Sequence, residues 1–190
     1  MVVLRLLLPI AAIALVAFLL VPNRSGGGAA GRASPCGPVE LAPPELGLER
    51  TRALTLCLLN ASRAKHGLAP LHREERLELA SQRHAEDMVA RRYFEHDDPG
   101  GVDPQDRILA TGYPAHNAIT GENIAWATGP KASPARVVDL WMHSPPHREN
   151  ILRAAFTEIG VGVAPGAPAQ PRSADPPATY ATDFGGPPIR

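Results

Sequence analysis

The stretch WMHSPPHRENIL, residues 141–152, is the densest run of polar and rigid residues in this chain. The proline pair Pro145-Pro146 predicts the end of a helix, because a proline disfavours the α conformation of the residue before it. His147 follows the prolines directly, and the apolar pair Ile151-Leu152 anchors the other side. The pattern therefore predicts an imidazole held in place just after a rigid turn.

A second polar cluster, GENIA at residues 121–125, lies upstream, and a histidine, His96, lies in the segment EHDDPGG that follows a helix. Two imidazoles and a carboxylate can bind a divalent metal with one coordination position open. The candidate metal ligands are therefore His96, Glu122 and His147, with zinc or magnesium as the ion. Their wide separation in the sequence means that only the fold could bring them together.

The charge balance excludes some partners. The chain has 190 residues, with 19 Lys and Arg against 19 Asp and Glu. A net charge of zero favours neither nucleic acid nor an anionic membrane surface. We therefore expect no nucleic-acid partner and no membrane contact outside the N-terminal segment.

The N-terminal segment, residues 1–35, predicts export. Leu6 to Val21 is an unbroken apolar run that follows Arg5 and precedes a flexible linker. The run is short for a membrane-spanning helix and suits the apolar core of a signal peptide. Residues 6–21 are thus either a cleaved signal or an uncleaved membrane anchor. In both cases the rest of the chain is secreted or tethered on the outer face of the membrane.

Export gives the cysteine count a meaning. Cys36 and Cys57 are the two cysteines of the chain, and a pair in an oxidising compartment predicts one disulfide. The alternative is two unpaired thiols. We expect a Cys36–Cys57 disulfide that ties the entering chain to the first helix.

Apolar periodicity and capping residues predict helices at the front of the chain and strands at the back. His84 falls on an apolar helix face, where it is either a core histidine bonded to backbone or part of the floor of a site. Residues 113–120 are expected to be irregular, and residues 187–190 to be a frayed tail. The predicted helices are 46–65, 73–92, 104–112 and one opened by Ser133-Pro134; the predicted strands are 157–164 and 179–184, paired antiparallel.

Eight segments in order carry a resemblance: LLNASRAKHGLAPL (58–71), LELASQRHAEDM (77–88), FEH (94–96), DRILATGY (106–113), GENIA (121–125), WMHSPPHRENIL (141–152), EIGVGVA (158–164) and YATDFG (180–185). Together they resemble the bacterial branch of the CAP superfamily, the SCP-type domain of cysteine-rich secretory proteins, antigen 5 and pathogenesis-related proteins. The resemblance implies one domain at residues 36–186. It also implies an α+β fold, a three-layer α-β-α sandwich with a central antiparallel sheet and a large open cleft.

In that superfamily the cleft holds two histidines and acidic residues that can take a divalent metal. The resemblance places Glu122, His147 and, less directly, His96 in this cleft, with His84 at its border. Where animal and plant members have a second acidic residue, this chain has Ser144. That departure weakens both metal affinity and any mechanism that needs two carboxylates.

Three functions follow as hypotheses. The first is an exported binding module whose cleft accepts a small, lipid-like ligand, with or without a metal. The second is a metal-dependent hydrolase of peptide or cell-wall material, in which His96 and His147 hold the metal and Glu122 is a ligand or general base. In the third, the polar cluster is structural and braces buried loops by hydrogen bonds; its members would be Glu122, Asn123, Arg148 and Asn150.

Overall fold

The computed structural model describes residues 35–114 and 118–188. The predicted signal or anchor at residues 6–21 lies outside the described residues. Among the residues that are described, no helix is long and apolar enough to cross a membrane.

Four strands form one mixed sheet in the order β1-β3-β4-β2. They are β1 (His72–Arg73), β2 (Ala118–Thr128), β3 (Glu158–Pro165) and β4 (Pro177–Pro188). The pair β3·β4 is antiparallel, as predicted, and β2·β4 is antiparallel too, whereas β1 runs parallel to β3. The central sheet is therefore antiparallel, as expected, with the two-residue strand β1 as a parallel addition at one edge. The chain passes along that edge as it crosses from one helix layer to the other. The His72 N–H donates to the carbonyl of Thr157, the residue before β3, and the Glu74 N–H donates to the carbonyl of Ile159 in β3.

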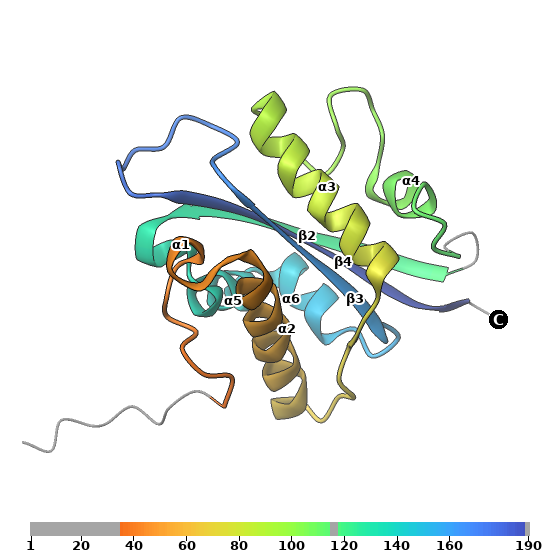
Figure 1. Ribbon diagram of the computed structural model, residues 1–190. Coiled ribbons are helices and arrows are strands. Elements are labelled where there is room, and N and C mark those ends of the chain that lie inside the picture. Colours follow the sequence, from red (N-terminus) through yellow and green to blue (C-terminus); the bar gives the residue numbers. More distant parts are fainter. Residues whose placement is uncertain (1–34, 115–117, 189–190) are drawn as a thin grey trace, which may run out of the picture. The chain divides into compact units, whose positions relative to one another are not determined.

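Helices cover both faces of the sheet, so the α+β, three-layer prediction is confirmed (Figure 1). One layer contains α3 and α4, and the other contains α1, α2, α5 and α6. Their bounds are α1 Pro43–Leu46, α2 Leu48–Lys65, α3 Glu75–Arg91, α4 Pro104–Leu109, α5 Pro134–His143 and α6 Pro145–Leu152, with a 3-10 turn at Gly129–Ala132.

Strand β3 separates the two layers by alternation of its side chains. Ile159, Val161 and Val163 pack with the α2, α5 and α6 layer. Gly160 and Gly162 face α3, where an added Cβ would lie 2.0 Å and 2.3 Å from the nearest backbone atoms of that helix. Helix α3 therefore rests directly on the sheet, which brings its buried side chains close to the neighbouring strands.

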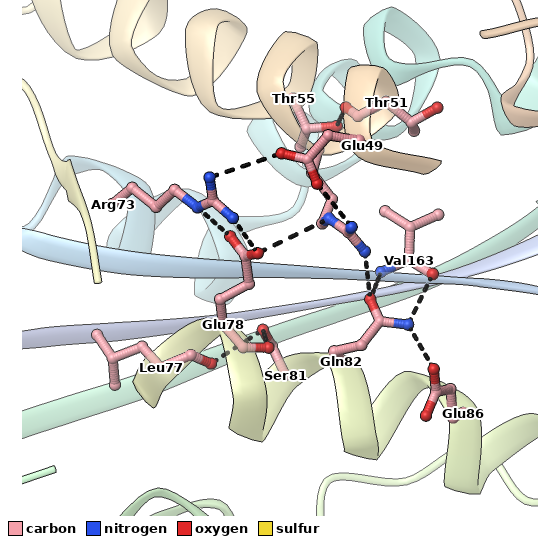
Figure 2. Close-up of polar contacts among 11 residues, drawn as sticks. Glu49, Thr51, Thr55, Arg73, Leu77, Glu78, Ser81, Gln82, Glu86 and Val163 are labelled. Atoms are coloured by element: carbon pink, nitrogen blue, oxygen red, sulfur yellow. Dashed lines mark hydrogen bonds and ion pairs between the residues drawn. The ribbon is translucent and has the colours of Figure 1, made fainter. Parts of the chain in front are cut away.

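A network of polar contacts ties α3 to the edge of β3 (Figure 2). The Gln82 amide nitrogen donates to the Val163 carbonyl at 3.0 Å, and its oxygen accepts from the Val163 N–H at 2.9 Å. The Gln82 side chain thus pairs with the backbone of β3 at a position that the two-residue strand β1 does not reach. Glu78 pairs with Arg73 of β1 in the same network, at 2.6 Å.

A helix ends just before the two prolines of the opening stretch, as predicted, and the prolines themselves begin a second helix. Helix α5 ends at His143, and Pro145 and Pro146 occupy the first turn of α6. Proline is tolerated there because the N–H that it lacks would have no helical partner. His147 therefore lies in the first turn of α6 and not in a loop.

Two further predictions were wrong about β structure. Part of the segment expected to be irregular belongs to β2, which starts at Ala118. Strand β4 continues into the predicted frayed tail, where Pro188 pairs with Ala118. Mutual pairing explains both differences, because β2 and β4 extend each other beyond what either segment predicts alone.

The predicted disulfide is confirmed. Cys36 is bonded to Cys57 in α2, at a sequence separation of 21 residues. It fastens the start of the described chain to the first long helix, where the crosslink reduces the entropy of the unfolded chain.

A buried arginine joins α2 to α6. The Arg63 residue is 1% exposed, and its guanidinium donates to four carbonyl oxygens. Two of these close the end of α6, Ile151 at 2.8 Å and Arg153 at 3.1 Å. The others belong to Phe156 at 3.0 Å and Ala69 at 2.8 Å. This contact satisfies carbonyls that the helix end leaves unpaired and fixes α6 in place.

We predict that Arg63→Met lowers the free energy of unfolding by about 3 kcal/mol or more, since it leaves several buried carbonyls without donors. Arg63→Lys should lose less, because an ammonium keeps the charge and some donors but lacks the planar fork. Chemical denaturation measures both. The exposed Arg83 of α3 supplies the control, and Arg83→Met should change stability by no more than about 0.5 kcal/mol. Equal effects of the Arg63 and Arg83 variants would contradict this account.

Candidate functional site

The two polar clusters of the sequence meet at the outer edge of β2. This strand lies at the end of the sheet, so alternate carbonyls on its outer side need donors from elsewhere. The Asn150 amide donates to the Glu122 carbonyl at 3.1 Å, and the Trp141 indole N–H donates to the Ile124 carbonyl at 3.1 Å. Residues from α5 and α6 thus close the edge of the strand that carries Glu122.

Glu122 and Asp183 lie opposite each other on β2 and β4. Directly paired residues of antiparallel strands point to the same face. That face is the one that packs on α3, because neighbouring positions Ile124 and Ala181 pack with Ala85 and Met88 of α3. Two carboxyl groups are therefore buried side by side under the α3 layer.

The Glu122 side chain is 1% exposed, and each of its carboxylate oxygens has a basic partner. His96 Nδ1 lies 2.7 Å from Oε1, and the Arg107 guanidinium donates to Oε2 at 2.8 Å. His84 Nε2 lies farther away, 3.7 Å from Oε2. Burial of a carboxylate is costly without such partners, so Glu122 depends on residues from α4, α3 and the loop between them.

Asp183 is buried without a comparable partner. Among the described residues, no donor lies within hydrogen-bond distance of either carboxyl oxygen when Asp183 is ionised. Burial and the adjacent charge of Glu122 raise the pKa of Asp183 well above its ordinary value. Both causes favour the protonated carboxyl, which can donate a hydrogen bond to Glu122.

His84 combines the two roles considered for it. It is fully buried, its Nε2 lies 3.1 Å from the Glu95 carbonyl, and its Nδ1 lies 3.3 Å from the Tyr93 hydroxyl. The carbonyl partner requires Nε2 to carry the proton in the neutral ring. Burial lowers the pKa of His84, which favours that neutral form. His84 is therefore a core histidine that also borders the Glu122 carboxylate.

His147 lies close enough to His96 for their charges to interact. Burial lowers the pKa of His147, and the charge of His96 lowers it further. Its Nδ1 is buried and has no hydrogen-bond partner within the described part of the chain. Ser144 is the N-cap residue of α6, and its side chain makes no capping hydrogen bond to that helix.

The residues expected to brace the site divide into two groups. Asn123 donates to the His147 carbonyl at 3.0 Å and accepts from Asn150 at 2.9 Å, which links β2 to α6. Arg148, in contrast, is exposed, and the contact of its guanidinium is with His66 Nε2 at 3.4 Å. The expectation that Arg148 supports a buried loop was wrong, because its position on α6 faces solvent; Arg63 performs that task.

A hollow of about 360 Å³ opens beside His96 and Glu122. Ligand sites in proteins are commonly of this size or larger. Five polar side chains, one proline and one glycine form its walls: His96, Asp103, Pro104, Gln105, Thr120, Gly121 and Glu122. The His96 side chain is 49% exposed, so a ligand in the hollow can reach its imidazole ring.

The predicted metal ligands do not form a metal site as they are arranged. Among the described residues, no three His, Cys, Asp or Glu side chains are placed to hold a metal ion. Glu122 has both oxygens engaged, by His96 and Arg107, and the carboxylate that would complete the set is replaced by Ser144. The residues therefore do not fit a divalent metal with Glu122 as a ligand.

The sequence did not single out Arg107 or Asp183 as site residues, although both lie in the segments that carry the resemblance. The alternation of TYATDF would have placed Asp183 on one face of its strand, but its pairing with Glu122 needed β2, which was not predicted. Arg107 reaches Glu122 across 15 residues from a separate helix. No local pattern indicates such a contact.

Comparisons with known proteins agree with this fold. Residues 56–170 match the family model described as CAP, the Cysteine-rich secretory protein family. The chain belongs to this family. A solved structure described as an extracellular protein containing a SCP domain, from Bacillus anthracis, is 25% identical with a TM-score of 0.60; the similarity covers 76% of this chain and 43% of that one. A cysteine-rich secretory protein from Staphylococcus aureus, 17% identical with a TM-score of 0.52, has the same fold; 74% and 40% of the two chains are covered.

Two Bacillus subtilis (strain 168) proteins are similar in sequence. The uncharacterized protein YkwD is 43% identical over 105 residues, which is 55% of this chain and 39% of the relative. The uncharacterized membrane protein YlbC is 36% identical over 110 residues, which is 57% of this chain and 30% of the relative. The similarity thus spans less than half of each relative.

The His96–Glu122 contact predicts a pH dependence of stability. The hydrogen bond from His96 to Glu122 raises the pKa of His96, against opposing effects of burial and Arg107. A raised pKa in the folded state means that His96 stabilises the fold fully below its unfolded pKa of about 6.5, and that this contribution is lost as pH rises through the folded pKa. Groups that act on this ring are Glu122, Arg107, Asp97 and His147.

We therefore predict that His96→Gln destabilises the protein most near about pH 6 and progressively less towards about pH 9. Urea denaturation of both proteins at each pH gives the difference in unfolding free energy. His84, whose pKa is lowered, is present in both wild type and His96→Gln, so its contribution cancels in the difference between their unfolding free energies. A difference that is constant, or that grows as pH rises, would contradict the prediction.

Proposed function

We propose that this domain is a ligand-binding module of the cell exterior, whose hollow at His96 takes the anionic group of a small, lipid-like molecule. One observation carries the proposal. The His96 ring is half exposed and held by Glu122 through Nδ1, while its Nε2 has no hydrogen-bond partner among the described residues. The free side of the ring is thus available to a ligand in the hollow.

The charges around the ring favour an anion. Arg107 balances Glu122 at 2.8 Å, and burial and the charge of Glu122 favour the protonated form of Asp183. When His96 is protonated, its positive charge is then not balanced by Glu122, which is already paired with Arg107. An Nε2–H of an imidazolium then donates a charge-assisted hydrogen bond to a carboxylate or phosphate oxygen.

Apolar surface near the same loop supports a ligand with an aliphatic part. Phe94, two residues before His96, and Val102, at the other end of the loop, are both exposed. Isolated exposed apolar residues are common, but two of them on the loop that carries His96 suit a molecule with an acidic head and an apolar tail.

Three features support a location outside the cytoplasm. The Cys36–Cys57 disulfide suits an oxidising compartment. The apolar run at residues 6–21 suits export. The Bacillus anthracis protein of similar fold is described as extracellular.

Binding of dodecanoate and of dodecanol tests this proposal. We predict that wild-type protein prefers the acid, and that His96→Ala weakens acid binding by roughly tenfold or more through loss of a charge-assisted hydrogen bond, with a smaller effect on the alcohol. Isothermal titration calorimetry near pH 6 measures both affinities. His143→Ala, at an exposed histidine of α5, is the matched control and should leave both affinities unchanged. Equal weakening of acid and alcohol, or no effect of His96→Ala, would reject the proposal.

A further inference from the structure

Arg107 is fixed in place before any ligand arrives. It lies in α4, whose N-terminus is capped by Asp103, with the Asp106 N–H donating to the Asp103 carboxylate at 2.8 Å. One arm of the guanidinium, Nη1, donates to the Val102 carbonyl at 2.9 Å. The other arm, Nη2, donates to Glu122 Oε2 at 2.8 Å. The side chain is 13% exposed, so the cation is largely enclosed between α4 and β2.

The Glu122 carboxylate has no free oxygen for another cation. His96 Nδ1 is 2.7 Å from Oε1, and Arg107 is at Oε2. With its side chain 1% exposed, Glu122 also has almost no surface through which an ion could approach. A metal ion bound to Glu122 would have to displace one of these two partners.

Displacement of Arg107 is unfavourable on charge grounds. A guanidinium keeps its positive charge at every pH at which the protein is folded. In a poorly solvated site, this charge strongly repels a divalent ion placed beside it. A guanidinium moved away from Glu122 would lose its ion pair and leave the enclosed pocket that holds it. Arg107 therefore supplies the positive charge that a metal would otherwise bring to this carboxylate.

We propose that Arg107 is the resident cation of this site, that its guanidinium occupies the position beside Glu122 that a divalent metal would need, and that the protein thereby excludes zinc and magnesium. Loss of the guanidinium should let a metal ion bind. It frees Oε2 of Glu122 on the carboxylate that His96 already contacts. An imidazole and a carboxylate are both donors that zinc uses in open sites.

Zinc titration by calorimetry tests the proposal on the whole protein, without any lipid, so its outcome is independent of the ligand assay above. Wild type and His96→Ala should bind zinc equally weakly, since exposed histidines such as His66 and His143 give the same background in both. Arg107→Met, which keeps an unbranched side chain without charge, should gain one site that is roughly tenfold or more tighter than this background. The double variant Arg107→Met/His96→Ala should lose it again.

Two further substitutions make the test specific to charge. Arg107→Gln retains an N–H donor for Glu122 and removes the charge, so it should also gain zinc binding. Arg107→Lys retains the charge and should bind zinc no better than wild type. Circular dichroism identifies the variants that are folded.

The proposal is overturned if wild-type protein binds one zinc ion tightly and both His96→Ala and Glu122→Gln weaken that binding. This wild-type comparison decides the matter even where an Arg107 variant does not fold. The proposal is equally overturned if folded Arg107→Met or Arg107→Gln binds zinc no better than wild type.

Discussion

The buried charge of Glu122 is the constraint on which the site depends. A carboxylate that is removed from water is stable when positive or hydrogen-bonding groups replace the water. Here those groups come from separate parts of the chain: Arg107 from α4, His96 from the loop before it, and the more distant His84 from α3. Each element must therefore dock correctly for Glu122 to be stable, so formation of the site and packing of the α3 layer depend on each other.

The opposite layer fixes the strand that carries Glu122. Trp141 and Asn150 close the outer edge of β2 by donating to two of its carbonyls, and Arg63 in turn holds the end of α6. Gly121 lets this contact form, because an added Cβ would lie 2.9 Å from the Asn150 amide oxygen. The stretch at residues 141–152 thus sets the position of Glu122 mainly through backbone carbonyls and contributes His147 to the surroundings of His96.

Much of the fold followed from local patterns, and the site followed only in part. Apolar stripes and caps predicted α2, α3, α4 and the start of α5, and alternation predicted β3 and β4. Strand β2 was not predicted, because polar residues occupy its centre. Glu122 faces one layer and Asn123 the other, so neither face of the strand shows an apolar pattern. The proline pair correctly predicted the end of α5, but the start of α6 at the same prolines was missed, because a Pro-Pro sequence is compatible with both the end and the beginning of a helix.

The residues that were missed share one property, which is that their partners are distant in sequence. Arg63 meets carbonyls some 90 residues away, and Asp183 meets Glu122 across β4 and β2. Neutron diffraction from a crystal grown in heavy water near neutral pD tests the central claim most directly. We predict deuterium on Asp183 and on His96 Nδ1, none on Glu122, and a fully deuterated Arg107 guanidinium at Glu122 Oε2. An ionised Asp183, or a metal ion in place of Arg107 beside Glu122, would contradict the account.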